Sequence, residues 1–458
     1  MEIIGKKARA AAFVSAVGLM VAGSVTTTPT NAGGNPIDVE VVPKQEAAGI
    51  KEITALTTKL QKSRKPLEGQ KGKVLRGVHP KSHGCVDATF TINDKIASEY
   101  RFGLFKHPGM YQAKIRYSNA SVLLEPDLKD GENGSRGMAI KVFGLNKNLG
   151  SFILEDGDAR NQDFLMINTP EFVFANVRDY LRLTRILVLA QGAGPFFIPL
   201  KLKGLKLLEV QPNQSLKLKL LTGTEPDEVK NAWGFYKTHP VFKGFNFGDF
   251  IRTAGSIKII GKIKSQPVRN PLQVEYFSAA PFQYGPNRVM KFSVVPAVKT
   301  DQAEFTDDEK KNIDPDYLAQ ALKETMTQKE GEKEKKPLEF SFMVQIVDNS
   351  QLNQPGPVGE NMIENAAIAW TEKNYSAVKF TSVKVATITI PAVDEKENLD
   401  FVNACKHLQF TPWHTLAAHK PLGGINRLRK PVYCESGEFR RNPPVNAKKV
   451  QCEEKKYK

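Results

Sequence analysis

The sequence predicts an α+β chain built around an antiparallel sheet or barrel, and two observations carry this prediction. Short runs that alternate apolar and polar residues, as half-buried strands do, fall into an early and a late group. The segment between the groups, residues 170–260, is expected to be helical and irregular. Strands, then helices, then strands again are typical of an α+β fold. The expected strands are 88–92, 113–117, 138–143, 289–295, 339–347 and 383–390.

The composition is that of a folded globular protein with a core large enough to enclose a bulky cofactor. The chain has 458 residues, of which 41% are hydrophobic and 25% charged. Its net charge of +16 would suit nucleic acid or an anionic membrane. However, the lysines are scattered through the expected strands and helices, and there is no arginine-rich arm. We therefore expect a solvated basic surface and no nucleic-acid partner.

Residues 1–32 resemble an export signal. Basic residues between Lys6 and Arg9 precede the charge-free run Ala10–Val25, and a small-residue cleavage motif ends at Ala32. This apolar run is shorter than the ~20 residues of a membrane span, so cleavage is preferred over an uncut anchor. We expect a periplasmic or secreted protein. An uncleaved N-terminal helix that anchors the chain is the alternative.

Three further segments follow the signal. Residues 33–69 are a polar arm with a helix expected over Glu46–Lys62, residues 70–440 form the main domain, and residues 441–458 form a basic tail. A second helix is expected over Asp316–Met326.

The stretch 198–221 alternates leucine and lysine. Such a stretch can lie on a membrane surface. Inward packing of its leucines is the preferred interpretation, so membrane contact is possible but not favoured.

The four cysteines are Cys85, Cys405, Cys434 and Cys452. Export would permit disulfides, and pairing among the last three is one possibility. Four unpaired thiols are the other.

The first segment that can carry chemistry is Arg76-Gly-Val-His79, just before the first expected strand. His79 and His83 are four residues apart, which on a helix would suit a metal ion. Pro80 and Gly84 make a regular helix through both histidines improbable. A role for His79 therefore depends on what else lies near it.

The second segment places arginines inside alternating strands. Arg116 belongs to Arg-Tyr-Ser118, and Arg136 opens Arg-Gly-Met-Ala-Ile-Lys141. Burying a guanidinium without an anionic partner is costly. These arginines therefore either face solvent or hold a buried carboxylate, such as a haem propionate.

The third segment contains Arg429 and Tyr433, four residues apart and so on one face of a helix. A cation beside a phenol favours the phenolate, which is the form that binds ferric iron. Pro431 predicts that this helix starts close to Lys430, because proline is tolerated only in a first turn.

Taken in order, these segments resemble the haem-binding landmarks of the catalase family, particularly its shorter bacterial catalase-related members. Each motif is weak alone, but the ordered set is specific and spans residues 70–435. The matching motifs are Arg76–His79, Arg116–Ser118, Arg136–Lys141, Asn168–Pro170 and Arg429–Tyr433.

The resemblance implies haem b in a catalase-like antiparallel β-barrel whose helical insertions enclose the cofactor over residues 70–440. It makes Tyr433 the axial iron ligand, Arg429 the charge partner of Tyr433, and His79 the acid/base on the other haem face. The residues implied to hold propionates are Arg76, Arg116 and Arg136.

One departure concerns the second distal residue. Catalases place two asparagines before Thr-Pro, and the first donates a hydrogen bond on the distal side. Here the order is Met166-Ile167-Asn168, so Ile167 holds that position. Asn168 is then the candidate catalytic residue, provided that a one-residue slip turns it to the required face.

The first functional hypothesis is an exported haem enzyme of catalase or peroxidase type that acts on hydrogen peroxide or organic hydroperoxides. Ile167 would leave room for an organic substrate. The alternative is a non-catalytic haem-binding or haem-carrier protein that uses Tyr433. His79 discriminates between them, because a carrier has no need of it. An exported barrel with neither haem nor activity is the third interpretation.

Overall fold

The computed structural model describes residues 39–441 with short gaps, and the expected signal peptide 1–32 lies outside the described residues. Of the expected tail 441–458, only residue 441 is described. The gaps are residues 64–74, 122–125, 129–132, 155–159, 191–195, 202–204, 212–216, 222–224, 301, 332, 353–360 and 398.

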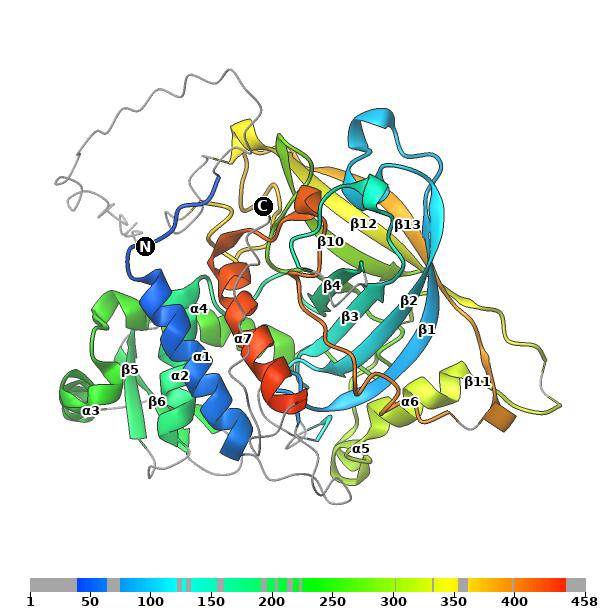
Figure 1. Ribbon diagram of the computed structural model, residues 1–458. Coiled ribbons are helices and arrows are strands. Elements are labelled where there is room, and N and C mark those ends of the chain that lie inside the picture. Colours follow the sequence, from blue (N-terminus) through cyan, green and yellow to red (C-terminus); the bar gives the residue numbers. More distant parts are fainter. Residues whose placement is uncertain are drawn as a thin grey trace, which may run out of the picture. The chain divides into compact units, whose positions relative to one another are not determined.

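Eight antiparallel strands form a closed β-barrel (Figure 1). They neighbour one another in the order β12-β13-β1-β2-β3-β4-β8-β10, and pairing of β10 with β12 closes the ring. The strands are β1 (Ser82–Ile92), β2 (Gly109–Asn119), β3 (Arg136–Val142), β4 (Gln162–Ile167), β8 (Tyr276–Phe277), β10 (Arg288–Pro296), β12 (Leu338–Asp348) and β13 (Thr381–Ile390). Three further two-residue strands are β9 (Phe282–Gln283), β11 (Thr327–Gln328) and β14 (Val393–Asp394).

Aromatic side chains fill the barrel. Phe90, Phe164, Phe292 and Phe342 come from four different strands and are all buried. The ring centroids of Phe164 and Phe342 lie 4.6 Å apart. Contacts of this kind between inward-pointing rings stabilise a barrel whose interior is a packed core and not a pore.

All six strands expected from alternation are present, whereas β4 and β8 were not predicted. Every residue of β4, from Gln162 to Ile167, is buried, because the barrel covers one face and later segments cover the other. A strand that is buried on both faces does not alternate in polarity, so the pattern that reveals the other strands is missing.

The insertion between β4 and β8 contains helices and a small sheet. The helices are α2 (Val177–Ala190), α3 (Pro226–Thr238) and α4 (Phe247–Lys264). Residues 196–221 were expected to be helical or irregular, and that prediction is wrong, because they form the antiparallel strands β5 (Phe196–Lys201), β6 (Leu205–Gln211) and β7 (Lys217–Leu221). The alternation of leucine and lysine has the two-residue period of a strand.

The remaining helices are α1 (Glu46–Ser63), α5 (Asp307–Asn312), α6 (Tyr317–Met326) and α7 (Gly423–Arg441). The predicted helices at Glu46–Lys62 and Asp316–Met326 are confirmed as α1 and α6. None of the helices in the described part of the chain combines the length and the hydrophobicity that a membrane span requires.

Helix α7 begins at Gly423, so the prediction that it starts near Lys430 is wrong. Pro431 lies inside it and removes one backbone donor, yet the helix continues. Packing against α1 and α2 compensates for this loss, since Leu428 and Val432 are buried against Ile53 and Val177.

A charge cluster fixes the first turn of α7. Arg427 of this turn forms ion pairs with Glu40, Glu46 and Glu364. The carboxylate of Glu364 also accepts a hydrogen bond of 2.9 Å from the backbone N–H of Gly424. Carboxylates at a helix N-terminus satisfy donors that have no partner within the helix.

Candidate functional site

A cavity lies between the outer face of the barrel and helix α7. The space between its walls, part of which is open to solvent, is about 640 Å³. Its walls come from the segment before β1, from strands β2, β3 and β4, from residues 409–410, and from α7. The lining residues are Arg76, Val78, His79, Arg116, Ser118, Met138, Ala139, Leu165, Met166, Gln409, Phe410, Arg429, Tyr433, Ser436, Gly437 and Arg440.

One face of α7 forms the wall of the cavity opposite the barrel. Arg429 and Tyr433 both line it, as their four-residue spacing predicts. Ser436, Gly437 and Arg440 continue this face at three, four and seven residues after Tyr433. The sequence reasoning missed these three residues. The helical period counted onward from Tyr433 would have found them.

His79 lies on the barrel side of the same cavity. Its backbone has φ of 53°, which is uncommon for a residue other than glycine. Its N–H donates to the carbonyl of Ser121 at 2.9 Å, and its carbonyl accepts from Nη2 of Arg116 at 2.9 Å. Its ring Nδ1 lies 3.1 Å from Oγ of Ser118. These contacts hold the strained backbone and orient the imidazole.

Glycine at position 137 makes room for the imidazole. A Cβ atom added to Gly137 would lie 2.5 Å from Nδ1 of His79, which is closer than real atoms approach. Strand β3 therefore needs a residue without a side chain at the point where His79 packs against it.

The imidazole of His79 is neutral at physiological pH. Burial, followed by repulsion from Arg116, Arg429 and Arg76, lowers the pKa of His79 to about 3. With the proton on Nδ1 directed to Ser118, Nε2 carries the lone pair. His79 can then accept a proton at Nε2.

Four arginines line the cavity, and no aspartate or glutamate is among the described lining residues. Arg116 is buried, and burial is the main reason why its pKa falls to about 10. Nη1 of Arg429 donates to Oδ1 of Asn426 at 3.3 Å. Grouping guanidinium ions in a cavity is costly unless an anion joins them. The electrostatics therefore fit a ligand with carboxylates.

The residues present fit a haem. A phenol on α7 faces a cavity whose opposite wall carries a neutral imidazole, and a phenolate is a known axial ligand of haem iron. Val78, Ala139, Leu165 and Phe410 give the cavity apolar surfaces for a macrocycle. The arginines supply more than enough charge for two propionates.

Arg136 and Asn168 do not line the cavity. The guanidinium of Arg136 is buried and bonds to Oδ1 of Asn119 and, at 2.5 Å, to the carbonyl of Asp127. Oδ1 of Asn168 accepts a hydrogen bond of 2.7 Å from the backbone N–H of Arg136. The structure therefore brings His79, Arg76, Arg116, Arg429 and Tyr433 together, and it leaves these two residues apart from them.

Strand register explains why these two residues lie elsewhere. Gly137 pairs with Ser118 on one side and with Ile167 on the other, so these three positions share one face of the sheet. Arg136 and Asn168 each lie one residue out of phase with that row. The backbone N–H of Asn168 donates to the carbonyl of Arg136 at 3.0 Å, so the pairing continues without a slip. Asn168 therefore does not replace the missing distal asparagine.

Ile167 lies on the face over which His79 packs. It pairs directly with Gly137 and is buried. An apolar side chain thus stands where the resemblance calls for an amide donor.

His83 does not form a pair with His79. It is fully buried in β1, and its Nε2 lies 3.0 Å from Oδ1 of Asn119. In the part of the chain that the structure describes, no group of three or more histidine, cysteine, aspartate or glutamate residues is arranged to hold a metal ion.

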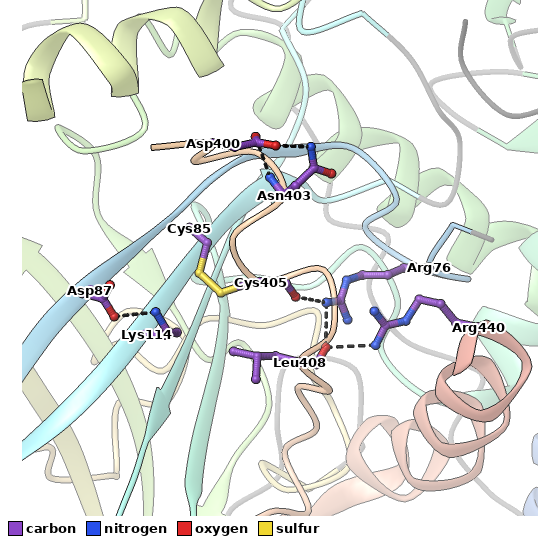
Figure 2. The surroundings of a disulfide bond; sticks show 9 residues. All are labelled: Arg76, Cys85, Asp87, Lys114, Asp400, Asn403, Cys405, Leu408 and Arg440. Atoms are coloured by element: carbon purple, nitrogen blue, oxygen red, sulfur yellow. Dashed lines mark hydrogen bonds and ion pairs between the residues drawn. A yellow bond between two sulfur atoms is a disulfide. The ribbon is translucent and has the colours of Figure 1, made fainter. Parts of the chain in front are cut away.

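A disulfide joins Cys85 of β1 to Cys405, with 5.7 Å between the two Cα atoms (Figure 2). From sequence, pairing among the last three cysteines and four unpaired thiols were both open. Cys405 pairs with Cys85 instead, so the first prediction is wrong for Cys405, and the prediction of four unpaired thiols is wrong. Cys434 is also disulfide-bonded. The Cys85–Cys405 bond lies beside the cavity, since the adjoining Gln409 and Phe410 line it.

Comparison with known proteins bears on the fold. No family model and no curated protein matches the chain. Among solved structures, a fungal catalase is similar with a TM-score of 0.52 and 14% identity, over 82% of this chain and 61% of that one. A bacterial catalase is similar with a TM-score of 0.50 and 14% identity, over 90% of this chain and 67% of that one. The chain thus spans about 61% of the length of the fungal catalase, and its fold is that of a catalase-like α+β barrel.

Proposed function

We propose that this chain binds haem b in the cavity and acts on peroxides. Tyr433 would hold the haem iron through its phenol oxygen, and Arg429 lies on the same face of α7. The propionates are held by Arg76, Arg116 and, in place of Arg136, Arg440. The single observation that carries the proposal is that Tyr433, His79 and four arginines line one cavity with no acidic side chain among them.

Haem, when bound, supplies an iron that coordinates the peroxide and exchanges electrons with it. The protein handles the proton. Nε2 of His79 accepts the proton from one peroxide oxygen and returns it to the other as the O–O bond breaks. Ser118, Arg116 and Gly137 keep the imidazole in position for both transfers.

The apolar surroundings of His79 favour organic hydroperoxides over hydrogen peroxide. Ile167 shares the sheet face of Gly137 without being among the residues that line the cavity, and it cannot donate the hydrogen bond that an asparagine would provide. Val78 and Leu165 give the cavity apolar surface. Without the amide, hydrogen peroxide is oriented by His79 alone. An organic group instead gains binding energy from contact with these side chains.

The same isoleucine supports a second candidate, a haem carrier. A carrier needs Tyr433 and the arginines but no distal donor. His79 decides between the two functions, because its three polar contacts serve an imidazole that a carrier would not need.

Two finer assignments belong to this proposal. The order of motifs from Arg76 to Tyr433 supports placement among the shorter bacterial catalase-related haem proteins. The basic start and the apolar run Ala10–Val25 support export to the periplasm or beyond.

Haem-loaded protein with the Tyr433→Phe or the His79→Ala substitution tests the proposal. We expect Tyr433→Phe to lose the tyrosinate-type spectrum and most of the bound haem. We expect His79→Ala to retain haem and to lose peroxide turnover by roughly 10²- to 10⁴-fold. Tyr111→Phe and His107→Ala, neither of which lines the cavity, are the matched controls.

Wild-type protein without a Soret band would refute haem binding. A Soret band with equal turnover in wild type and His79→Ala would establish the carrier instead of the enzyme.

A further inference from the structure

The segment Cys405–Phe410, called here the strap, forms part of the cavity wall without belonging to a helix or strand. Its last two residues, Gln409 and Phe410, line the cavity. Phe410 is buried beside Cys85, Leu165 and Cys405 on the outer face of the barrel. How the strap is attached therefore determines whether the cavity is closed.

One attachment is covalent. The Cys85–Cys405 disulfide links the start of the strap to strand β1, and the backbone N–H of Cys85 donates to the carbonyl of Phe401 at 2.8 Å. Both cysteines are buried, with 3% and 2% of their surface exposed, so the link is shielded from solvent.

A second attachment consists of two arginines, Arg76 from the segment before β1 and Arg440 from α7 (Figure 2). Nη2 of Arg76 donates to the carbonyls of Cys405 and Leu408 at 3.1 and 2.8 Å. Nη2 of Arg440 donates to the carbonyl of Leu408 at 2.9 Å, and Nη1 of Arg440 bonds to the carbonyl of Lys406. The carbonyl of Leu408 thus accepts from both guanidinium groups.

Arg76 and Arg440 also line the cavity, so each contacts the strap and faces the ligand space. The strap offers neutral carbonyls, whereas a ligand carboxylate is charged. Both acceptors bond to a charged donor, but a carboxylate adds ion-pair attraction and can accept two parallel bonds from one guanidinium, which a single carbonyl cannot. A carboxylate that enters the cavity therefore competes with the strap for both guanidinium groups.

We propose that the strap is a latch, which Arg76 and Arg440 hold closed in the ligand-free protein and which the carboxylates of the bound ligand release from both arginines. The Cys85–Cys405 disulfide fixes its first residue, and directly after its last residue the backbone N–H of Thr411 donates to the carboxylate of Asp163. This inference rests on the proposed haem site, because it assigns the competing carboxylates to the propionates.

Hydrogen exchange of the peptide 399–411 in the full-length oxidised protein tests the latch. The three states are ligand-free, haem-loaded and loaded with haem dimethyl ester, which lacks charged propionates. We expect haem to speed the exchange of the strap amides about fivefold, which is the effect of losing one or two hydrogen bonds. We expect the dimethyl ester to leave this exchange rate unchanged. Slower or unchanged exchange with bound haem would overturn the release, and so would equal acceleration by the ester.

A second arm does not depend on haem. In ligand-free protein, Arg440→Gln should speed strap exchange about fivefold, because two carbonyl contacts are lost. Arg101→Gln is the matched control, since Arg101 donates to the carbonyls of Asp94 and Ile96 in another loop. Unchanged strap exchange in Arg440→Gln would overturn the latch. If no Soret band forms when haem is added, the proposed function is contradicted. Strap exchange in ligand-free Arg440→Gln then still tests whether the arginines hold the strap.

The disulfide is tested with the double variant Cys85→Ala/Cys405→Ala. Peptides from α7 and the barrel report whether it has folded. In the folded ligand-free variant we expect the strap to remain protected by its arginines. After haem loading we expect the strap amides of the variant to exchange faster than those of haem-loaded wild type. Wild-type protection in the loaded variant would overturn the role of the disulfide as the fixed end. If the variant does not fold, wild-type protein reduced after haem loading gives the same comparison.

Discussion

Nη2 of Arg116 donates a hydrogen bond of 2.9 Å to the backbone carbonyl of His79. The resemblance to catalases implies that this arginine holds a haem carboxylate, and in this structure it fixes the backbone of His79, the residue to which we assign the proton transfers. His79 needs such support, because its φ of 53° is strained. One guanidinium therefore belongs to the cationic lining of the cavity and also fixes the position of the imidazole.

The first prediction follows from this contact. Arg116→Lys keeps the charge but lacks the planar fork that can serve the carbonyl and a carboxylate together. We expect turnover per bound haem to fall roughly tenfold, which is typical for loss of a residue that orients a functional histidine. Steady-state peroxide consumption and haem content are measured on the same samples. Arg288→Lys, outside the cavity, should not change either value.

The second prediction uses Gly137 as a steric probe. A methyl group at this position would overlap Nδ1 of His79, so Gly137→Ala should displace the imidazole and lower turnover about as much as His79→Ala. The haem spectrum should persist, because Tyr433 is untouched. Gly134→Ala is the control, since its nearest atom would lie 3.5 Å away, at ordinary contact distance. Equal turnover in the two glycine variants would show that His79 does not act.

The sequence motifs predicted well which residues lie near the cavity. They predicted less well which way the side chains of those residues point. Alternation identified six barrel strands, and the spacing of Arg429 and Tyr433 identified the face of α7. Arg136 and Asn168 also lie in matching motifs, but strand pairing places both one residue out of phase with Gly137 and Ile167. Register is set by pairing across the sheet, which the order of motifs along the chain does not contain.

Contacts between distant segments were the other part that could not be predicted. Cys85 and Cys405 are separated by 320 residues, and only the closed barrel brings them together. The start of α7 was misplaced because proline has a local cost, whereas the packing of Leu428 and Val432 that offsets it is tertiary. Local rules fail where a distant segment supplies the deciding contact.

The third prediction concerns stability and pH. Burial lowers the pKa of His79 to about 3 and of His419 to about 4, and it lowers the pKa of His83 well below its usual value. An unfolded histidine binds a proton near pH 6.5, whereas these three stay neutral in the folded protein. The unfolded state then binds more protons as pH falls, so stability is lost on the acid side of pH 6.5. His79 and His419 each contribute on the order of 1 kcal/mol per pH unit between pH 6.5 and about pH 4, and His83 adds to the loss in the same direction.

Urea unfolding of ligand-free protein at pH 7.5, 6.5 and 5 measures this dependence. His79→Gln should make the free energy of unfolding fall less steeply below pH 6.5, because it removes one of the three groups that stay neutral only in the folded protein. His107→Gln changes an exposed histidine and should leave the slope unaltered. A free energy of unfolding that stays constant from pH 7.5 to 5 would contradict the prediction.

The fourth prediction concerns a buried ion pair beside the cavity. Nζ of Lys141 lies 2.8 Å from Oδ1 of Asp163, and Oδ2 of Asp163 accepts from the N–H of Thr411 at 3.0 Å. Asp163→Asn leaves the lysine charge buried without its carboxylate, so we expect about 3–5 kcal/mol of destabilisation. The double change Lys141→Met/Asp163→Leu should cost much less, because no unpaired charge remains. Chemical unfolding of both variants checks this, and an equal loss would show that the hydrogen bond to Thr411 dominates.

The last prediction tests the distal position itself. Ile167 shares a sheet face with Gly137, over which His79 packs, so Ile167→Asn should place an amide donor beside the imidazole. We expect the rate of hydrogen peroxide disproportionation per bound haem, measured by oxygen evolution, to rise about tenfold. One added hydrogen bond to a reacting group, at about 1–1.5 kcal/mol, predicts a change of this size. Asn168→Ala should lower stability without changing this rate, since its amide accepts from Arg136 away from the cavity. The opposite result is that Asn168→Ala lowers the rate by more than Ile167→Asn raises it. That result would mean that Asn168 reaches the substrate, through a strand register that differs from the pairing of Gly137 with Ile167.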